Sequence, residues 1–309
     1  MPAVRGLEDF LRTLEIVEQR PINELEHCII GVDVFQWLRS NNFICSEALH
    51  SALGGLPLTL EHQVHKQLFE FHRWKIQPLF VFNGLKYSQN ARAPFSSSRS
   101  RKYAAKRKQA WRAMETDSVE RSKELFGQIS GYVSISAQDD LIRIFSRWNV
   151  LIPQRNQQLR KQWLDQQKKA GEQGTTGTTA PIAEPNYFRA ISWIRAPYYA
   201  ASQMAYLESQ EEMLHAVCGG CDLLMFGGEK VILNIDFMNG VFETTDLDRV
   251  LFALQVDRCP YSFIDTCLLS GFDASRTFEP LTMADLHSLS ADTNTAKKGR
   301  THRNFSYKC

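Results

Sequence analysis

Two polar residues, one of them an acid suited to metal chemistry, each follow a run of residues that predicts a buried strand. Asp33 ends the apolar run that starts at Cys28, and Asn83 comes directly after the run at 78–82, Pro-Leu-Phe-Val-Phe. In parallel sheets, ligands bind at the carboxyl ends of the strands. We therefore expect the two side chains to point into one crevice. Hard cations of the magnesium type require oxygen ligands, and carboxylates such as that of Asp33 also supply compensating charge.

A second stretch with chemical potential is strongly basic. Residues 99–112 contain no acid and are interleaved with Tyr103 and Trp111. Their basic residues are Arg99, Arg101, Lys102, Lys106, Arg107, Lys108 and Arg112. We predict a helix from about Ser100, whose residues Arg101, Lys102, Lys106, Arg107 and Lys108 contact nucleic-acid phosphates while the aromatic rings stack on bases. The alternative is a basic helix that is simply solvated.

Helices must alternate with strands to hold these residues in place. Apolar residues recur at helical spacing from Leu7 to Leu14 and from Leu60 to Trp74, and a short helix is expected around Phe35 to Leu38. The second half predicts a helix at 196–207 with Pro197 in its first turn, strands at 222–226 and 231–235, and a helix at 246–254. This alternation predicts an α/β fold with a twisted, mainly parallel sheet flanked by helices.

The overall composition is that of an ordinary globular protein. The 309 residues are 43% hydrophobic and 23% charged, and the formal net charge of +2 predicts no partner. We expect no membrane span, because no apolar run approaches about 18–20 residues. Residues 1–10 lack a signal-peptide pattern, and the seven cysteines follow no regular framework. We therefore expect an intracellular protein in a reducing compartment.

Two segments are poor in apolar residues. Residues 154–185 are rich in Gln, Lys, Gly and Thr, and we predict a flexible insertion there. Residues 282–309 are polar and patternless, which predicts an irregular tail.

Five short motifs occur in an order that is similar to a known family. They are Gly31-Val-Asp-Val, Val81-Phe-Asn-Gly, Ala196-Pro-Tyr-Tyr-Ala-Ala-Ser-Gln, Cys218-Gly-Gly-Cys-Asp-Leu-Leu-Met-Phe-Gly and Leu268-Leu-Ser-Gly-Phe-Asp. Together they resemble the N and I regions of the XPG/flap endonuclease superfamily. The resemblance implies a PIN-like, 5′-nuclease domain over residues 1–281, with an N region at about 1–115 and an I region at about 188–281.

The resemblance also implies a chemistry, which this sequence matches only in part. Members hydrolyse phosphodiesters with two divalent cations about 3.5–4 Å apart, held by about seven acids. Asp33, Asp222 and Asp273 match three of those acids. The replaced positions are Asn83, Tyr199, Ala201 and Gly220.

The missing acids lower the expected activity. Three carboxylates cannot balance the four positive charges of two divalent cations, and they supply too few ligands for both. We expect weak or absent nuclease activity and either no cofactor or one weakly bound Mg²⁺ at Asp33, Asp222 and Asp273. The alternative role for these acids is to cap helix N-termini.

Within the superfamily, the motifs are most similar to the N-terminal domain of the fungal maintenance-of-killer-toxin family of post-transcriptional regulators. That resemblance implies a cytoplasmic RNA- or protein-binding module in translational control. It also implies an ataxin-type partner of the poly(A)-binding protein, although family members are normally much longer. Two rivals remain, namely an active Mg²⁺-dependent structure-specific endonuclease acting on DNA or RNA, which would favour the nucleus, and a protein-interaction scaffold.

Two further patterns are weaker signals of metal binding. Cys218 and Cys221 lack a second Cys or His pair at suitable spacing, so a zinc or redox site is not expected. His62 and His65 are three residues apart on a predicted helix, with no neighbouring acid in a ligand pattern.

Overall fold

One mixed sheet organises the part of the chain that the structure describes. The computed structural model describes residues 7–40, 58–85, 94–116, 118–129, 135–172, 184–210, 214–254 and 260–271. Within them the strand order is β1-β7-β6-β5-β2-β3-β4. The strands are β1 Glu18–Pro21, β2 Ile29–Asp33, β3 Gln77–Phe82, β4 Ser192–Arg195, β5 Ala216–Cys218, β6 Lys230–Asp236 and β7 Val241–Asp246.

The five strands from β6 to β4 are parallel, so their carboxyl ends lie along one edge of the sheet. Strand β7 returns antiparallel to β6 through a turn at Gly240, where φ is +66°, and β1 adds antiparallel to β7. A positive φ is a conformation that glycine adopts without steric cost. The predicted α/β fold with a mainly parallel sheet is confirmed.

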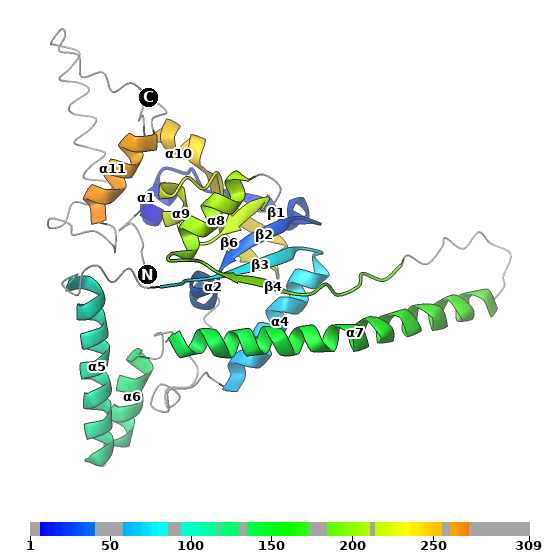
Figure 1. Cartoon of the computed structure of the whole chain (residues 1–309), viewed down its shortest axis with the longest axis horizontal. Coiled ribbons are helices and arrows are strands. Elements are labelled where there is room, and N and C mark those ends of the chain that lie inside the picture. Colours follow the sequence, from blue (N-terminus) through cyan, green and yellow to red (C-terminus); the bar gives the residue numbers. More distant parts are fainter. Residues whose placement is uncertain are drawn as a thin grey trace, which may run out of the picture.

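Helices cover both faces of the sheet (Figure 1). The helices are α1 Leu7–Thr13, α2 Val34–Ser40, α4 Leu58–Arg73, α5 Pro94–Glu115, α6 Val119–Ile129, α7 Ile135–Glu172, α8 Ala200–Ser209, α9 Asp222–Met225, α10 Leu247–Ala253 and α11 Pro260–Gly271, with a 3-10 turn at Ile22–Leu25. None of the described helices is long and apolar enough to cross a membrane.

Each face of the sheet has its own apolar core. One core joins the helices α1, α8, α9, α10 and α11 through residues such as Met204, Leu223 and Val250. The other joins α2, α4 and the first half of α7 through residues such as Phe80 and Trp148. Burying one large apolar side chain contributes about 1.5–3 kcal/mol, so these two cores fix the sheet on which the strand-end residues sit.

Two helical arms extend from this body in Figure 1. Helices α5 and α6 form a hairpin, in which the Ser122 hydroxyl donates to the carbonyl of Ala110 at 2.9 Å and the rings of Trp111 and Phe126 meet edge to face at 5.5 Å. The second arm is the far half of α7, which continues beyond the sheet.

Three predictions of local structure are wrong. Residues 154–172, predicted to be flexible, continue helix α7, because Gln, Lys and Arg are good helix formers that extend a helix already anchored in the core. Residues 222–225 form helix α9 rather than a strand, and α8 begins at Ala200, so Pro197 precedes it. The remainder of the predicted insertion at 173–183 and the predicted tail at 282–309 lie outside the described residues.

Candidate functional site

Asp33 is the last residue of β2, and its carboxylate caps the helix that follows. Its Oδ1 accepts hydrogen bonds from the backbone N–H groups of Phe35 at 2.8 Å and Gln36 at 3.0 Å. The side chain is buried, with 8% of the residue exposed. Capping by Asp contributes about 1 kcal/mol to helix stability and places a negative charge at the positive end of the helix dipole. The carboxylate that would bind metal therefore also holds the start of α2.

Asn83 follows β3, the neighbour of β2, and caps a different helix. Its Oδ1 accepts a hydrogen bond from the backbone N–H of Ala200 at 2.7 Å, at the first residue of α8. Asp33 on β2 pairs with Val81 on β3. Asn83 therefore lies two residues beyond the partner of Asp33, just past the end of the neighbouring strand. Asp33 and Asn83 thus lie at the same edge of the sheet, but each side chain bonds the start of a different helix, so a shared crevice for the two stays a prediction.

The segment before α8 runs against the end of β3. The N–H of Gly84 donates to the carbonyl of Tyr198 at 2.8 Å, and that of Leu85 donates to Pro197 at 2.9 Å. A Cβ added to Gly84 would lie 1.8 Å from the carbonyl oxygen of Ala196, which no side chain can tolerate. Glycine is required at this position because two backbone segments meet there.

A third group of residues reaches the site from the end of β5. A Cβ on Gly219 would lie 3.5 Å from the Cβ of Asp33, and a Cβ on Gly220 would lie 2.6 Å from Oδ1 of Asp222 and 4.0 Å from Cδ of Gln36. Asp222 starts α9 and is 9% exposed. A carboxylate at position 220 would crowd that of Asp222, so Gly220 gives Asp222 its present space.

These contacts show which predicted site residues come together. Asp33 is a neighbour of Gly219, and Asp222 is a neighbour of Gly220. Asn83 contacts the start of α8, where Tyr199 is the N-cap residue and Ala201 is buried in the core. Asp273 lies outside the described residues. Within the described part of the chain, no group of three or more His, Cys, Asp or Glu side chains is placed to hold a metal ion.

The donor set can be compared with the needs of a cation. Asp33 and Asp222 together carry two negative charges, which balance one divalent cation but not two. A Mg²⁺ ion held by one or two carboxylates keeps several of its waters. One hydrated Mg²⁺ therefore fits these two residues on charge, whereas the two-cation arrangement does not.

The two neighbouring thiols are strongly disfavoured as thiolates. Burial, together with the smaller effect of the negative charge of Asp33, raises the pKa of Cys218 to about 12. The pKa of the Cys221 thiol is also raised, chiefly by burial. Both thiols therefore stay protonated near neutral pH, when thiolate is the form that binds zinc or exchanges disulfides.

Glu208, at the end of α8, is a structural carboxylate that the motif comparison missed. Its two oxygens accept the backbone N–H groups of Glu229 and Lys230, each at 2.8 Å, and tie α8 to the start of β6. The residue is only 7% exposed, and burial raises its pKa despite these bonds. Its helical spacing from the apolar residues Ala201 and Met204 was a signal that it faces the core.

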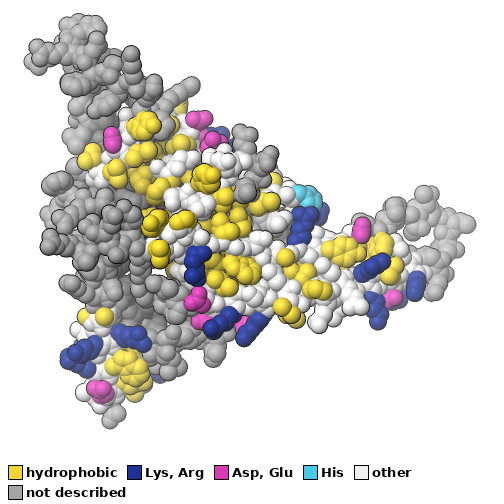
Figure 2. All heavy atoms as spheres, in the orientation of Figure 1, with side chains coloured by type: hydrophobic (Ala, Val, Ile, Leu, Met, Phe, Trp, Pro, Cys, Tyr) yellow, Lys and Arg dark blue, Asp and Glu magenta, His cyan; other side chains and the backbone are white. Residues whose placement is uncertain are grey.

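The basic stretch lies on helix α5 as predicted, away from the sheet. Arg101 and Lys102 are in this helix, and the side chains of Lys106, Arg107 and Lys108 are exposed. Ala110 is buried between α5 and α6. Figure 2 shows basic side chains gathered on this arm.

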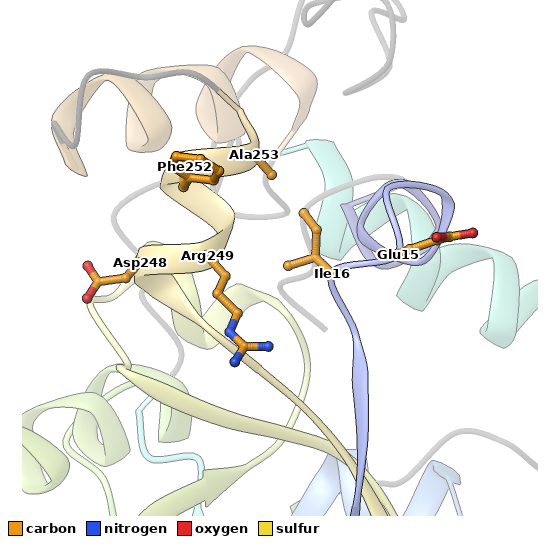
Figure 3. A pocket seen from close by; sticks show the side chains of 6 residues that line it. All are labelled: Glu15, Ile16, Asp248, Arg249, Phe252 and Ala253. Atoms are coloured by element: carbon orange, nitrogen blue, oxygen red, sulfur yellow. The ribbon is translucent and has the colours of Figure 1, made fainter.

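A recess of about 480 Å³ lies elsewhere in the molecule (Figure 3). Its lining residues are Glu15, Ile16, Asp248, Arg249, Phe252 and Ala253. It lies between the turn after α1 and helix α10, which begins where β7 pairs with the first residue of β6. The recess is therefore at the amino edge of the parallel strands, opposite the edge that carries Asp33.

The chain is similar to known protein families and sequences. The XPG N-terminal domain matches residues 2–110, and the XPG I-region matches residues 190–273. Post-transcriptional regulator MKT1 of Cryptococcus neoformans is 25% identical over 279 residues, which are 89% of this chain and 31% of the relative. MKT1 of Saccharomyces cerevisiae is 28% identical over 293 residues, with 90% and 32% covered. Exonuclease 1 of Arabidopsis thaliana is 24% identical over 294 residues, with 93% and 33% covered.

The chain thus spans about a third of the length of these relatives. Among solved structures, the catalytic core of Rad2 in complex with DNA substrate has a TM-score of 0.55 at 15% identity, covering 94% of this chain and 68% of that one. Flap endonuclease-1 from Methanococcus jannaschii has a TM-score of 0.53 at 13% identity, with 97% and 81% covered. These structures share the fold, and the two matched regions show that the chain belongs to the XPG/flap endonuclease superfamily.

Proposed function

We propose that this chain is a nuclease-fold module that binds RNA or another single-stranded nucleic acid without cutting it, within a protein that regulates mRNA after transcription. The observation that carries the proposal is the use of the strand-end residues as helix caps. Asp33 caps α2, and a neutral Asn83 caps α8 where the superfamily pattern has an acid. The residues that remain hold helices in place, and too few carboxylates are left for two cations.

The charge at the site supports the loss of cutting. Hydrolysis by two cations requires one ion to activate water and another to stabilise the leaving oxygen. The uncharged side chains of Asn83, Tyr199, Ala201 and Gly220 remove four negative charges from the superfamily pattern. A single hydrated Mg²⁺ at Asp33 and Asp222 would lack the second ion of this pair.

The basic arm supports retained binding. Lys106, Arg107 and Lys108 are exposed on α5, and phosphate contacts of this kind bind nucleic acids independently of sequence. Two relatives that match about nine-tenths of the chain are named post-transcriptional regulators, which supports mRNA as the target. By the motif resemblance alone, we extend the proposal to the cytoplasm and to an ataxin-type protein partner.

A cleavage assay tests the proposal. The full chain is incubated with flap and single-stranded DNA and RNA in Mg²⁺ or Mn²⁺, beside Asp33→Asn and Asp222→Asn. Asn is as good an N-cap as Asp, so Asp33→Asn removes the charge while it keeps the cap. We expect binding without cleavage by all three proteins. Cleavage by the wild type that Asp33→Asn abolishes would instead identify an active Mg²⁺-dependent endonuclease.

A binding assay with charge reversal at Arg101, Lys106 and Arg107 completes the test. We expect the reversed variant to lose most of its affinity for single-stranded RNA, and to keep the helical content of the wild type. Unchanged affinity would remove α5 as the binding surface. Absence of both cleavage and binding in the wild type would leave the protein-interaction scaffold as the function.

A further inference from the structure

Helix α7 has a buried face that continues into its projecting half. Phe145, Trp148 and Ile152 are buried in the core, and Leu159 and Trp163 continue the same stripe at helical spacing, half-buried. The helix can pack along much of one side through this apolar stripe. The stripe also determines which side of the projecting half faces outward.

The segment at 184–191 holds that inner side in place. The side-chain amide of Asn149 exchanges two hydrogen bonds with the backbone of Ile191, at 2.8 and 2.9 Å, and Asn156 does the same with Phe188, at 2.8 and 3.0 Å. The guanidinium of Arg155 lies 3.9 Å from the ring centre of Trp148. The helix is therefore oriented by specific contacts as far as residue 156.

The outward side of the projecting half is basic. Between residues 155 and 169 the chain has five basic residues and one acid, Asp165. Asp165 is exposed between Lys161 and Lys168 on the side opposite the stripe. The three cations Arg160, Lys161 and Lys168 are exposed away from the stripe, with Leu164 between them at helical spacing. We call these three cations the α7 track. Figure 2 shows basic side chains along this arm.

The chemistry of the α7 track favours a nucleic-acid backbone over a protein helix. A helix that docks in a groove uses apolar anchors at i, i+3 or i+4, and i+7. On this side of α7 the exposed large apolar residues are Val150 and Leu164, fourteen positions apart, with Gln154 and Gln157 between them. Three exposed cations without apolar anchors at docking spacing suit a polyanion whose charges repeat along its length.

We propose that the α7 track contacts the phosphates of an RNA strand that extends beyond the α5 arm, so that the two helical arms share one long ligand. This inference rests on the proposed function, because it names a second surface for the same ligand class. The exposed cations of the α7 track cover about 12 Å at 1.5 Å per residue, enough to meet several phosphates in a row.

RNA length separates the two surfaces in a binding experiment. Fluorescence anisotropy is measured with unstructured RNAs of about 10 nucleotides, which is within the range of site sizes expected for one binding surface, and of about 40 nucleotides, which is well above it. The track variant is Arg160→Gln, Lys161→Gln and Lys168→Gln, because Gln keeps helix propensity while it removes charge. The control variant, Lys66→Gln, Arg73→Gln and Lys230→Gln, removes three exposed charges elsewhere. Circular dichroism checks the helical content of both.

For the long RNA, we expect the track variant to lose about tenfold or more in affinity, and the slope of log affinity against log salt to fall by about 2, at about 0.7 per lost contact. The affinity of the track variant for the short RNA, and the affinity of the control variant for either RNA, are expected to change by less than about twofold. That change is small compared with the loss of three phosphate contacts. The charge-reversed α5 variant is expected to bind both RNAs more weakly.

The other outcomes are distinct. A track variant that binds the long RNA like the wild type, while the α5 variant fails, overturns this inference and leaves the proposed function intact. A wild type that binds neither RNA overturns both. Binding of polyglutamate, but not of RNA, to the wild type through the α7 track overturns the inference in favour of an acidic protein partner.

Discussion

The side-chain oxygen of Asn83 lies 2.7 Å from the backbone nitrogen of Ala200, which joins the end of β3 to the first residue of α8 across 117 positions of the chain. Asp33 makes the equivalent contact with its own following helix, α2. The two residues therefore fix the starts of two helices at the carboxyl edge of the parallel strands. Structural capping explains why both positions carry an oxygen acceptor, although Asn83 has no charge.

Substitutions at Asn83 are expected to separate the effect of the hydrogen-bond acceptor from the effect of a negative charge at this position. Asn83→Ala removes the bond to Ala200 and should lower the free energy of unfolding by about 1–2 kcal/mol. Asn83→Asp keeps an acceptor and should change the stability by less than half as much as Asn83→Ala, without restoring cleavage, because Gly220 still lacks a carboxylate. Urea unfolding and a flap-cleavage assay measure the two effects. A stable Asn83→Ala protein, or an Asn83→Asp protein that cuts, would contradict this account.

Gly84 provides a steric test of the same junction. Gly84→Ala would place a Cβ 1.8 Å from the carbonyl oxygen of Ala196, so the two backbone segments must separate. We expect destabilisation by more than about 4 kcal/mol, the range reserved for severe backbone or core disruption. Gly227→Ala is the matched control, because nothing lies within 4 Å of its added Cβ and only the φ of +87° is strained. That control should lose only about 1–2 kcal/mol. Comparable losses in thermal melts would show that the close approach at Gly84 is not limiting.

The sequence predicted the elements whose patterns are local. Strands β2 and β3 and helix α4 follow from uninterrupted apolar runs or helical spacing, and Asp33 and Asn83 follow from their positions after strands. By contrast, a four-residue apolar run such as Leu223 to Phe226 suits a short strand and a buried helix equally well. Burial of Leu223 and Leu224 beside α8 decides for the helix.

Long-range contacts account for the rest of the differences. The polar composition of residues 154–172 predicted flexibility, yet Asn149 and Asn156 bond a segment more than thirty positions away, and this segment packs along the helix. Neither those bonds nor the one between Asn83 and Ala200 leaves a periodic mark in the sequence. The identity of the capped helix could therefore be learned only from the structure.

The two asparagines of α7 should hold the segment at 184–191 against the body. Each bonds both the N–H and the carbonyl of one residue, so Asn149→Ala or Asn156→Ala leaves two partly buried backbone groups without that partner. We expect a loss of about 1–3 kcal/mol for each, and faster cleavage near Tyr187 by chymotrypsin. Gln157→Ala, on the exposed side, is the control and should change neither property. Equal proteolysis rates in all proteins would argue that other contacts hold the segment.

Glu208 should make stability fall as pH rises. Burial, which outweighs its two backbone bonds, raises the pKa of Glu208 in the folded protein above its ordinary value of 4.5. The folded state therefore holds this proton more tightly than the unfolded state, so the contribution of Glu208 to stability is greatest below pH 4.5 and declines as pH rises through the folded-state pKa.

Glu208→Gln cannot titrate at this position, so the difference in unfolding free energy, wild type minus variant, should decrease over that pH range in urea titrations. The Gln variant keeps one carbonyl acceptor for the N–H groups of Glu229 and Lys230. Glu208→Ala keeps no acceptor and should be less stable at every pH. A difference that is flat with pH, or that grows as pH rises, would show that the two backbone bonds outweigh burial at this carboxylate.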